Sequence, residues 1–287
     1  MFDPKPVKFP YPVETDKHYL VVKKDDGTVF DKDYPYIDNS KKFRAGYLFT
    51  RAMLYAVVFP LARIRLGLRV KGRENLKKHR DIIKKGVISL SNHVHMWDYI
   101  SVMLAVKPFR TNILAWDKNI SGENGWIIRH VGGIPVPDGD TRAMRAFLVS
   151  VRKLIEGGGW LHLCAEGSMW EYYAPIRPFK RGSAFFACRL DRPVIPIAFS
   201  YREPGWLRKN VFHQIAKLTV SIGEPLFPDK SLPESEREPD LTRRCHAEVC
   251  RLAGIDPEKN IYEPIFNDSK RVDYYTDTYG IGYKGSW

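Results

Sequence analysis

The chain has 287 residues, and its 46 Lys and Arg residues against 33 Asp and Glu residues give a formal net charge of +13. This length suits one large domain with terminal additions, and a hydrophobic content of 44% is ordinary for a globular protein. The excess of positive charge is typical of a protein with an anionic partner, either nucleic acid or an acidic membrane surface, and it also fits a merely basic surface.

The cysteines and the first residues exclude two further classes of protein. Cys164, Cys188, Cys245 and Cys250 show no CxxC pair and no regular spacing, so we expect no disulfide scaffold. Cys164 and Cys188 lie in apolar segments and are expected to be buried thiols. The N-terminal residues lack the charged and then apolar pattern of a signal peptide, which favours a cytoplasmic protein.

The N-terminal part is expected to contain an arm and a helix. Residues 1–40 are rich in Pro, Lys, Asp and Tyr and predict an extended arm, and a helical region follows over 41–67. Within it, an uncharged run of 11 residues over 52–62 lies between Arg51 and Arg63. A spanning helix needs about 20 residues, so the run predicts an interfacial helix with arginines at the lipid headgroups. A helix packed on the domain fits the same pattern.

Residues 68–257 alternate between short apolar segments and segments with apolar residues at helical spacing. Strands are expected at 86–90, 111–116, 134–136, 160–164, 193–200 and 217–222. Helices are expected at 97–106, 125–131, 141–155, 183–190 and 234–252. This alternation predicts an α/β domain with a central, mostly parallel sheet flanked by helices. The tail over 258–287 is aromatic and polar, and no role is assigned to it.

A histidine and a carboxylate stand at the end of the first of these strands, in the sequence Asn92-His93 followed by Asp98. Sites in open α/β sheets gather at such strand-to-helix turns. The pair suits general-base catalysis, in which a neutral imidazole takes a proton from a hydroxyl while the carboxylate fixes the tautomer of the ring. No Gly-x-Ser-x-Gly elbow occurs, so we expect direct attack by the substrate hydroxyl and no acyl-enzyme. His93 and His95 alternate as metal ligands on a strand would, but no third ligand motif accompanies them, and no metal is expected.

Further blocks follow in a fixed order, and each of them alone fits an ordinary turn, helix start or strand. They are Gly133-Ile134-Pro135-Val136, Glu166-Gly167-Ser168, Phe179-Lys180-Arg181-Gly182 and Val194-Ile195-Pro196-Ile197. Together with Asn92-His93 and Asp98, this order resembles the glycerolipid acyltransferase family typified by lysophosphatidic acid acyltransferase. That family carries Asn-His-x4-Asp, a Gly-x-Ile block, Glu-Gly-Thr-Arg with a Phe-Lys-x-Gly continuation, and a Val-Pro-Ile strand. The resemblance spans about residues 45–225.

The resemblance implies an α/β acyltransferase fold over 68–257 with His93 and Asp98 as the catalytic pair. It implies an acyl-CoA or acyl-carrier protein donor, no cofactor, and a lysophospholipid acceptor, with 1-acyl-sn-glycerol-3-phosphate converted to phosphatidic acid. It assigns substrate binding to Asn92, Glu166, Gly167 and Ser168. The basic balance and the helix over 41–67 place the protein on the cytoplasmic side of the cell membrane as a peripheral or monotopic protein bound to anionic lipid.

Two residues depart from the family pattern. Met169 stands where the family has Arg after Glu-Gly-Thr, and Asp138 stands where the second block ends in Arg. Both changes remove a charge-assisted donor for a phosphate. Candidate replacements are Arg142, Arg177, Lys180 and Arg181.

Two alternatives to a phosphatidate-forming enzyme stay open, one favoured by these departures and the other by the net charge of +13. One is an acyltransferase of the same fold with another lysophospholipid, an amino-lipid or a glycolipid as acceptor. The other is a non-catalytic basic protein that binds membrane or nucleic acid. Because Lys and Arg are spread along the whole chain without a recognised nucleic-acid motif, we expect no nucleic-acid partner.

Overall fold

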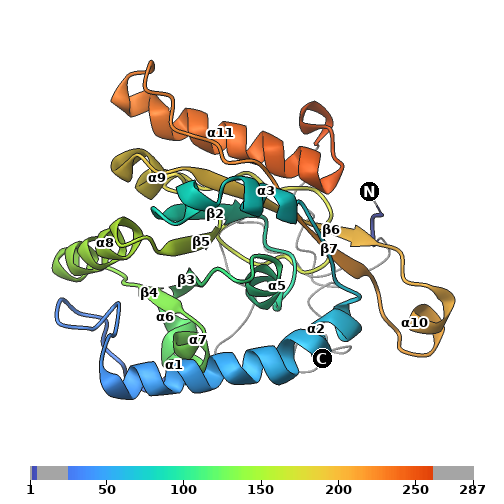
Figure 1. Cartoon of the computed structure of the whole chain (residues 1–287), viewed down its shortest axis with the longest axis horizontal. Coiled ribbons are helices and arrows are strands. Elements are labelled where there is room, and N and C mark those ends of the chain that lie inside the picture. The colour runs from blue at the N-terminus through green and yellow to red at the C-terminus, as the bar shows by residue number, and fades with distance from the viewer. Residues whose placement is uncertain (1, 5–24, 261–287) are drawn as a thin grey trace, which may run out of the picture.

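A seven-stranded sheet forms the centre of the computed structural model, which describes residues 2–4 and 25–260 (Figure 1). The strand order is β1-β7-β6-β2-β5-β3-β4. The strands are β1 (Arg69–Lys71), β2 (Val87–Ser91), β3 (Thr111–Trp116), β4 (Gly133–Val136), β5 (Trp160–Cys164), β6 (Val194–Arg202) and β7 (Lys217–Ile222). Of the pairings, only β6 with β7 is antiparallel among the described strands. The predicted α/β fold with a mostly parallel sheet is therefore confirmed.

Helices cover both faces of the sheet, and the side chains of β2 pack alternately against the helices on each face. Val87 packs in one core cluster with residues of α5 (Asp98–Ala105) and α2 (Phe59–Leu66), whereas Ile88 packs in another with residues of α8 (Thr141–Glu156). Successive side chains on a strand point to opposite faces, so a strand buried on both faces reads as one continuous apolar run. The remaining helices are α3 (Arg73–Lys78), α4 (Arg80–Ile83), α6 (Asp117–Ser121), α7 (Gly125–His130), α9 (Phe185–Leu190), α10 (Trp206–Asn210) and α11 (Glu234–Ala253).

The N-terminal helical region is one continuous helix. It consists of α1 (Lys41–Met53), a π-helical turn (Leu54–Val58) and α2, and Ser40 caps its start by accepting a hydrogen bond from the backbone of Phe43. The helix has 26 residues and is long and apolar enough to cross a membrane by length and composition. The 11-residue uncharged run therefore underestimated the apolar segment, because the arginine at each end of the run does not end the helix.

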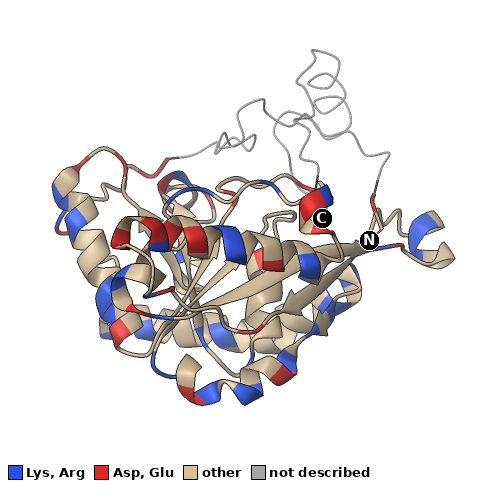
Figure 2. Cartoon of the chain, turned by 90° about the horizontal axis from the view of Figure 1, so that it is seen from above, with Lys and Arg blue, Asp and Glu red and all other residues tan. Residues whose placement is uncertain are grey.

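Acidic and basic side chains are unevenly distributed over the fold. The helix Lys41–Leu66 contains no Asp or Glu, whereas α11 contains five acidic residues. Figure 1 places α11 on the side of the molecule opposite α1 and α2, and Figure 2 shows acidic residues concentrated on α11. The side of the molecule that carries α1 and α2 is therefore more positively charged than the side that carries α11.

Two cysteine predictions need correction. Cys164 and Cys188, which were expected to be buried, are half-buried, whereas Cys245 and Cys250 are buried. Cys164 is the last residue of β5, at the carboxyl end of this central strand, and Cys188 lies near the end of the short helix α9. All four cysteines are free thiols. The proposed boundaries at residues 40, 67 and 257 stay predictions.

Candidate active site

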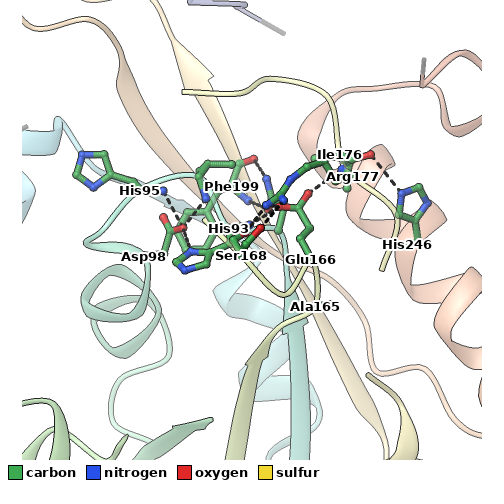
Figure 3. Close-up of polar contacts among 12 residues, drawn as sticks. His93, His95, Asp98, Ala165, Glu166, Ser168, Ile176, Arg177, Phe199 and His246 are labelled. Atoms are coloured by element: carbon green, nitrogen blue, oxygen red, sulfur yellow. Dashed lines mark hydrogen bonds and ion pairs between the residues drawn. The ribbon is translucent and has the colours of Figure 1, made fainter. Parts of the chain in front are cut away.

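The predicted site residues follow two neighbouring strands at one edge of the sheet (Figure 3). β2 ends at Ser91 and β5 ends at Cys164, and these two residues are partners in the parallel register. His93 and Glu166 each follow two residues later, so they leave the sheet together. The backbone N–H of His93 donates to Glu166 Oε2 at 2.8 Å. The topology therefore brings together the first and third motifs, which are 73 residues apart in the chain.

Asp98 is the first residue of α5 and holds the turn that presents His93. Its Oδ2 atom accepts hydrogen bonds from His93 Nδ1 at 3.0 Å and from the backbone N–H groups of Val94 at 2.7 Å and His95 at 2.9 Å. The Asp98 side chain is 1% exposed and the His93 side chain is 25% exposed. Because the carboxylate accepts from Nδ1, Nε2 is the ring nitrogen with a lone pair for an incoming proton.

Opposing effects set the pKa of the His93 imidazole. Burial lowers this pKa because it disfavours the imidazolium ion, whereas Cys164 and Asp98 raise it through charge and hydrogen bonding. The raising effects of Cys164 and Asp98 together exceed the lowering effect of burial, so the pKa of His93 lies above its ordinary value. The site thus stabilises the protonated ring, which is the form that a general base reaches in the transition state.

A buried ion pair fixes the loop after β5. Arg177 donates to Glu166 Oε2 at 2.9 Å and to Ser168 Oγ at 3.0 Å, and its guanidinium lies 4.5 Å from the ring centroid of Trp170. The second carboxylate oxygen of Glu166 accepts from the Arg177 backbone N–H at 2.7 Å. Both charged side chains are 1% exposed. Glu166 also accepts a hydrogen bond from the His93 backbone, so the ion pair holds the catalytic turn in position. The Arg177 guanidinium is buried and already binds Glu166 and Ser168.

Asn92 has a similar positioning geometry. Its side-chain amide donates to the Phe199 carbonyl at 3.0 Å and accepts from the Phe199 N–H at 2.8 Å. The side chain is fully buried. Asn92 therefore links the end of β2 to β6 and fixes where the chain turns toward His93.

The basic candidates differ in their distance from this turn. The aliphatic part of Lys180 lies against Gly167, whose φ of +82° is a left-handed conformation that favours glycine. Lys180 is half-buried and the next residue, Arg181, is exposed. Arg142 is exposed in the first turn of α8, beyond the edge strand β4. Three strand spacings of about 4.8 Å separate β4 from β2, so the strand that precedes Arg142 lies about 14 Å from the strand that leads to the catalytic turn.

The two departures from the family pattern leave no cation at their positions. Met169 is 4% exposed and contributes to the core, so its side chain is not a surface substitute for a cation. Asp138 is exposed in the loop after β4. Lys180 and Arg181 are therefore the cations best placed for an anionic substrate group.

Sequence reasoning missed several buried polar residues that surround the catalytic turn. His162 lies on β5 with Nδ1 2.9 Å from Ser89 Oγ, and His95 Nε2 lies 3.4 Å from a carboxylate oxygen of Glu171. Burial lowers the pKa of both histidines to about 3, so both rings are neutral at physiological pH. The period-two pattern of β5 places His162 on the same face as Cys164, and this was the available signal for a second histidine near the site.

The geometry does not support a metal site formed by His93 and His95. His95 Nδ1 accepts from the backbone N–H of Trp97 at 3.0 Å, and its other ring nitrogen faces Glu171. Over residues 2–4 and 25–260, no group of three or more His, Cys, Asp or Glu residues is arranged to hold a metal ion. The two rings therefore have separate partners.

Comparison with known proteins adds the family. The family model described as Acyltransferase matches residues 67–200, which includes the turn at His93 and the loop at Glu166. Residues 67–200 belong to the acyltransferase family. This confirms, at the level of the family, the resemblance that the ordered sequence blocks carry.

Two further comparisons concern the whole chain. The crystal structure of the 1-acyl-sn-glycerophosphate (LPA) acyltransferase PlsC from Thermotoga maritima matches with a TM-score of 0.45 and 18% identity, over 79% of this chain and 87% of that one. No curated protein matches the chain. The residues that match the family model include β1 through most of β6 and every predicted site residue.

The Glu166–Arg177 pair gives a stability prediction for the acyltransferase domain. Arg177→Met should lower the free energy of unfolding by about 3–5 kcal/mol, because it leaves the Glu166 carboxylate buried without its cation. Glu166→Gln combined with Arg177→Met should recover part of the loss, since no charge then stays buried. Urea unfolding measures both values.

A surface arginine provides the control for that measurement. Arg189 pairs with Glu234, and the two side chains are 68% and 81% exposed. Arg189→Met should change the free energy of unfolding by no more than about 0.5 kcal/mol. A loss of less than about 1 kcal/mol for Arg177→Met would show that the buried pair does not hold the loop.

Proposed function

We propose that the protein transfers a fatty acyl group from a thioester donor, acyl-CoA or acyl-carrier protein, to a hydroxyl of a lysophospholipid. The observation that carries this proposal is the His93–Asp98 pair, in which a fully buried carboxylate orients a quarter-exposed imidazole. It belongs to an acyltransferase-family domain. The acceptor that fits the family resemblance is 1-acyl-sn-glycerol-3-phosphate, with phosphatidic acid as the product.

In the proposed reaction the acceptor hydroxyl attacks the thioester carbonyl carbon while His93 Nε2 takes the hydroxyl proton. The new C–O bond forms, the C–S bond breaks, and the imidazolium returns its proton to the departing thiolate, so that an ester and a free thiol result. Asp98 stabilises the imidazolium in between. The protein supplies no nucleophile to this sequence, and no acyl-enzyme forms.

The helix Lys41–Leu66 supports association with a membrane. Its exposed apolar side chains include Leu48, Phe49, Val57 and Ile64, which are between 49% and 68% exposed. Its charged residues are all Lys or Arg. Apolar residues with flanking cations are typical of helices bound to an anionic membrane surface. We propose a peripheral or monotopic protein on the cytoplasmic side of the cell membrane.

One observation favours a second acceptor class. Met169 is buried where the family has a cation, and the Arg177 guanidinium is engaged with Glu166 and Ser168. An acceptor without a phosphomonoester, such as another lysophospholipid, an amino-lipid or a glycolipid, would need no such cation. Lys180 and Arg181 are the residues through which the two acceptor classes can be distinguished.

Lys180→Gln separates these possibilities. With lysophosphatidic acid as acceptor, we expect KM to rise about tenfold or more, because a charge-assisted hydrogen bond is worth about 1.5–3 kcal/mol. With an uncharged monoacylglycerol as acceptor, KM should not change. Arg142→Gln is the matched control, since Arg142 lies in the first turn of α8, after the edge strand β4. Transfer of acyl groups from acyl-CoA to a mixed lysolipid extract, followed by lipid mass spectrometry, identifies the preferred acceptor. Absence of transfer to every lysolipid would contradict the proposed function.

A further inference from the structure

The connection between β6 and β7 carries an unusually exposed apolar surface. We call residues 205–213, which include α10, the finger. Most of the surface of its large apolar side chains is exposed: Trp206 is 75% exposed, Leu207 56%, Val211 53% and Phe212 69%. Single exposed apolar residues are ordinary, but a contiguous group indicates a binding surface. In Figure 1 α10 projects from the body of the molecule.

The finger is fastened to the end of the N-terminal helix. The Gln214 side chain donates to the Arg65 carbonyl at 2.9 Å and accepts from Arg208 at 2.7 Å. Arg208 also reaches the Arg65 carbonyl, at 3.5 Å. On the α2 side of this junction, Leu61 is 49% exposed and Ile64 is 68% exposed. The two exposed apolar groups are therefore held together by hydrogen bonds and form one surface.

The charges around this surface have one sign. The finger contains Arg208 and Lys209 and no acidic residue, and the helix Lys41–Leu66 contains no acidic residue either. The five acidic residues of α11 lie on the side of the molecule opposite that helix (Figures 1 and 2). An anionic surface would attract the finger and the N-terminal helix more strongly than α11, whose acidic residues and four arginines nearly balance, and this favours one orientation.

A cavity of about 430 Å³ lies between the finger and α2 and extends inward to the catalytic turn. Its walls are largely apolar and include Leu61, Ile64, Leu207 and Phe212. Its inner wall contains His95, whose backbone N–H donates to the same Asp98 oxygen that binds His93. A lipid that enters between the finger and α2 therefore approaches the turn that carries the candidate base.

We propose that the finger is a second membrane-docking element, which inserts with α2 into the headgroup region of an anionic bilayer and opens this cavity to lipid. The occupant of the surface is lipid, because the surface combines exposed aromatic residues with cations and continues an apolar helix. The purpose of the docking rests on the proposed function, but the docking itself does not. A protein partner or a second copy of the chain would instead bury the same residues without any need for an anionic surface.

The test compares binding of full-length variants to sedimentable vesicles made of phosphatidylcholine and phosphatidylglycerol in equal parts. Trp206→Glu with Val211→Glu, two finger residues that do not line the cavity, should lower the apparent partition coefficient about tenfold or more, because two apolar side chains that enter the interface become charged. Phe227→Glu is the matched control, since Phe227 is 48% exposed on the loop that leads to α11. It should bind like the unaltered protein. All the replaced side chains are exposed, so the variants should keep the circular dichroism spectrum and Tm of the parent.

The outcomes separate the docking surface from the enzyme activity. Equal vesicle binding by the double variant and the parent, or no binding by the parent at low salt, would overturn the proposal. So would a parent that is dimeric in light scattering and becomes monomeric in the double variant. Thiol release from a short-chain acyl-CoA with a soluble short-chain lysolipid should be unchanged in the double variant. If no variant releases thiol but vesicle binding still depends on the finger, the proposed function falls and the docking surface stands.

Discussion

His93→Ala is expected to lower kcat/KM for acyl transfer by about 10²–10⁴-fold, which is the usual contribution of a general base. The substitution removes the imidazole but keeps the backbone N–H that donates to Glu166, so the turn after β2 is retained. The side chain is 25% exposed, and its loss leaves no large cavity in the core. Acceptor-dependent thiol release from acyl-CoA measures the rate, and thermal unfolding measures the integrity of the fold.

Two control variants make this result specific. His79→Ala removes a histidine whose partner is Glu224, at a site between α3 and α4, and it should leave kcat/KM unchanged. Cys164→Ala removes the thiol that contributes to the raised pKa of His93. It should keep turnover within about tenfold, because direct transfer uses no protein nucleophile and removal of the thiol only changes the basicity of the ring. A loss with Cys164→Ala as large as with His93→Ala would indicate an acyl-enzyme on Cys164 instead.

Asp98→Asn is expected to produce a loss of about the same size, 10²–10⁴-fold, because a neutral amide no longer stabilises the imidazolium that His93 becomes in the transition state. The asparagine oxygen can still accept from the Val94 and His95 backbone groups. In that position it can also accept from His93 Nδ1, because the single Oδ2 atom of Asp98 accepts all three hydrogen bonds. The ring keeps its tautomer, but it loses the negative charge that stabilises the imidazolium. The variant should therefore be folded, with little activity, and the two changes combined should cost little more than His93→Ala alone.

Most strands of the central sheet were predictable because each carries a strong local signal. The expected ranges 111–116, 160–164 and 217–222 coincide with β3, β5 and β7. A strand covered on both faces by helices reads as a short apolar run between turn residues, and the sequence has such runs. The short helices α3, α4, α6 and α10 have four to six residues each and carry no periodic pattern that a sequence can reveal.

The candidate site was predictable as a set of motifs but not as a geometry. The placement of Glu166 against the His93 backbone depends on the neighbouring positions of β2 and β5, which no local pattern encodes. The burial of Arg177 likewise depends on how the loop after β5 folds back on Glu166 and Trp170, and its sequence has no periodic pattern that shows this. From sequence alone, Arg142 and Arg177 were equal candidates for a substrate cation. In the structure one lies beyond the edge strand and the other is inside an ion pair.

The helix Lys41–Leu66 shows the limit of reading charge as a boundary. Arg51 and Arg63 bound an uncharged run, but long arginine side chains extend away from the helix axis, so a charged residue need not end an apolar helix. Gly67 ends this helix instead, with a φ of +54° in the left-handed region. Glycine in this conformation is a common end to a helix, and the position of Gly67 was the better signal.

The most direct measurement of the central claim is the pH dependence of kcat/KM for the parent and for Asp98→Asn. The account predicts that activity in the parent falls on the acidic side as His93 becomes protonated, because only the neutral ring can act as a base. Asp98 raises the pKa of His93, so removal of its charge should lower that pKa. The residual activity of Asp98→Asn should then decline at lower pH than that of the parent. An acidic limb at the same pH in both proteins would contradict the assignment of His93 and Asp98 as the catalytic pair.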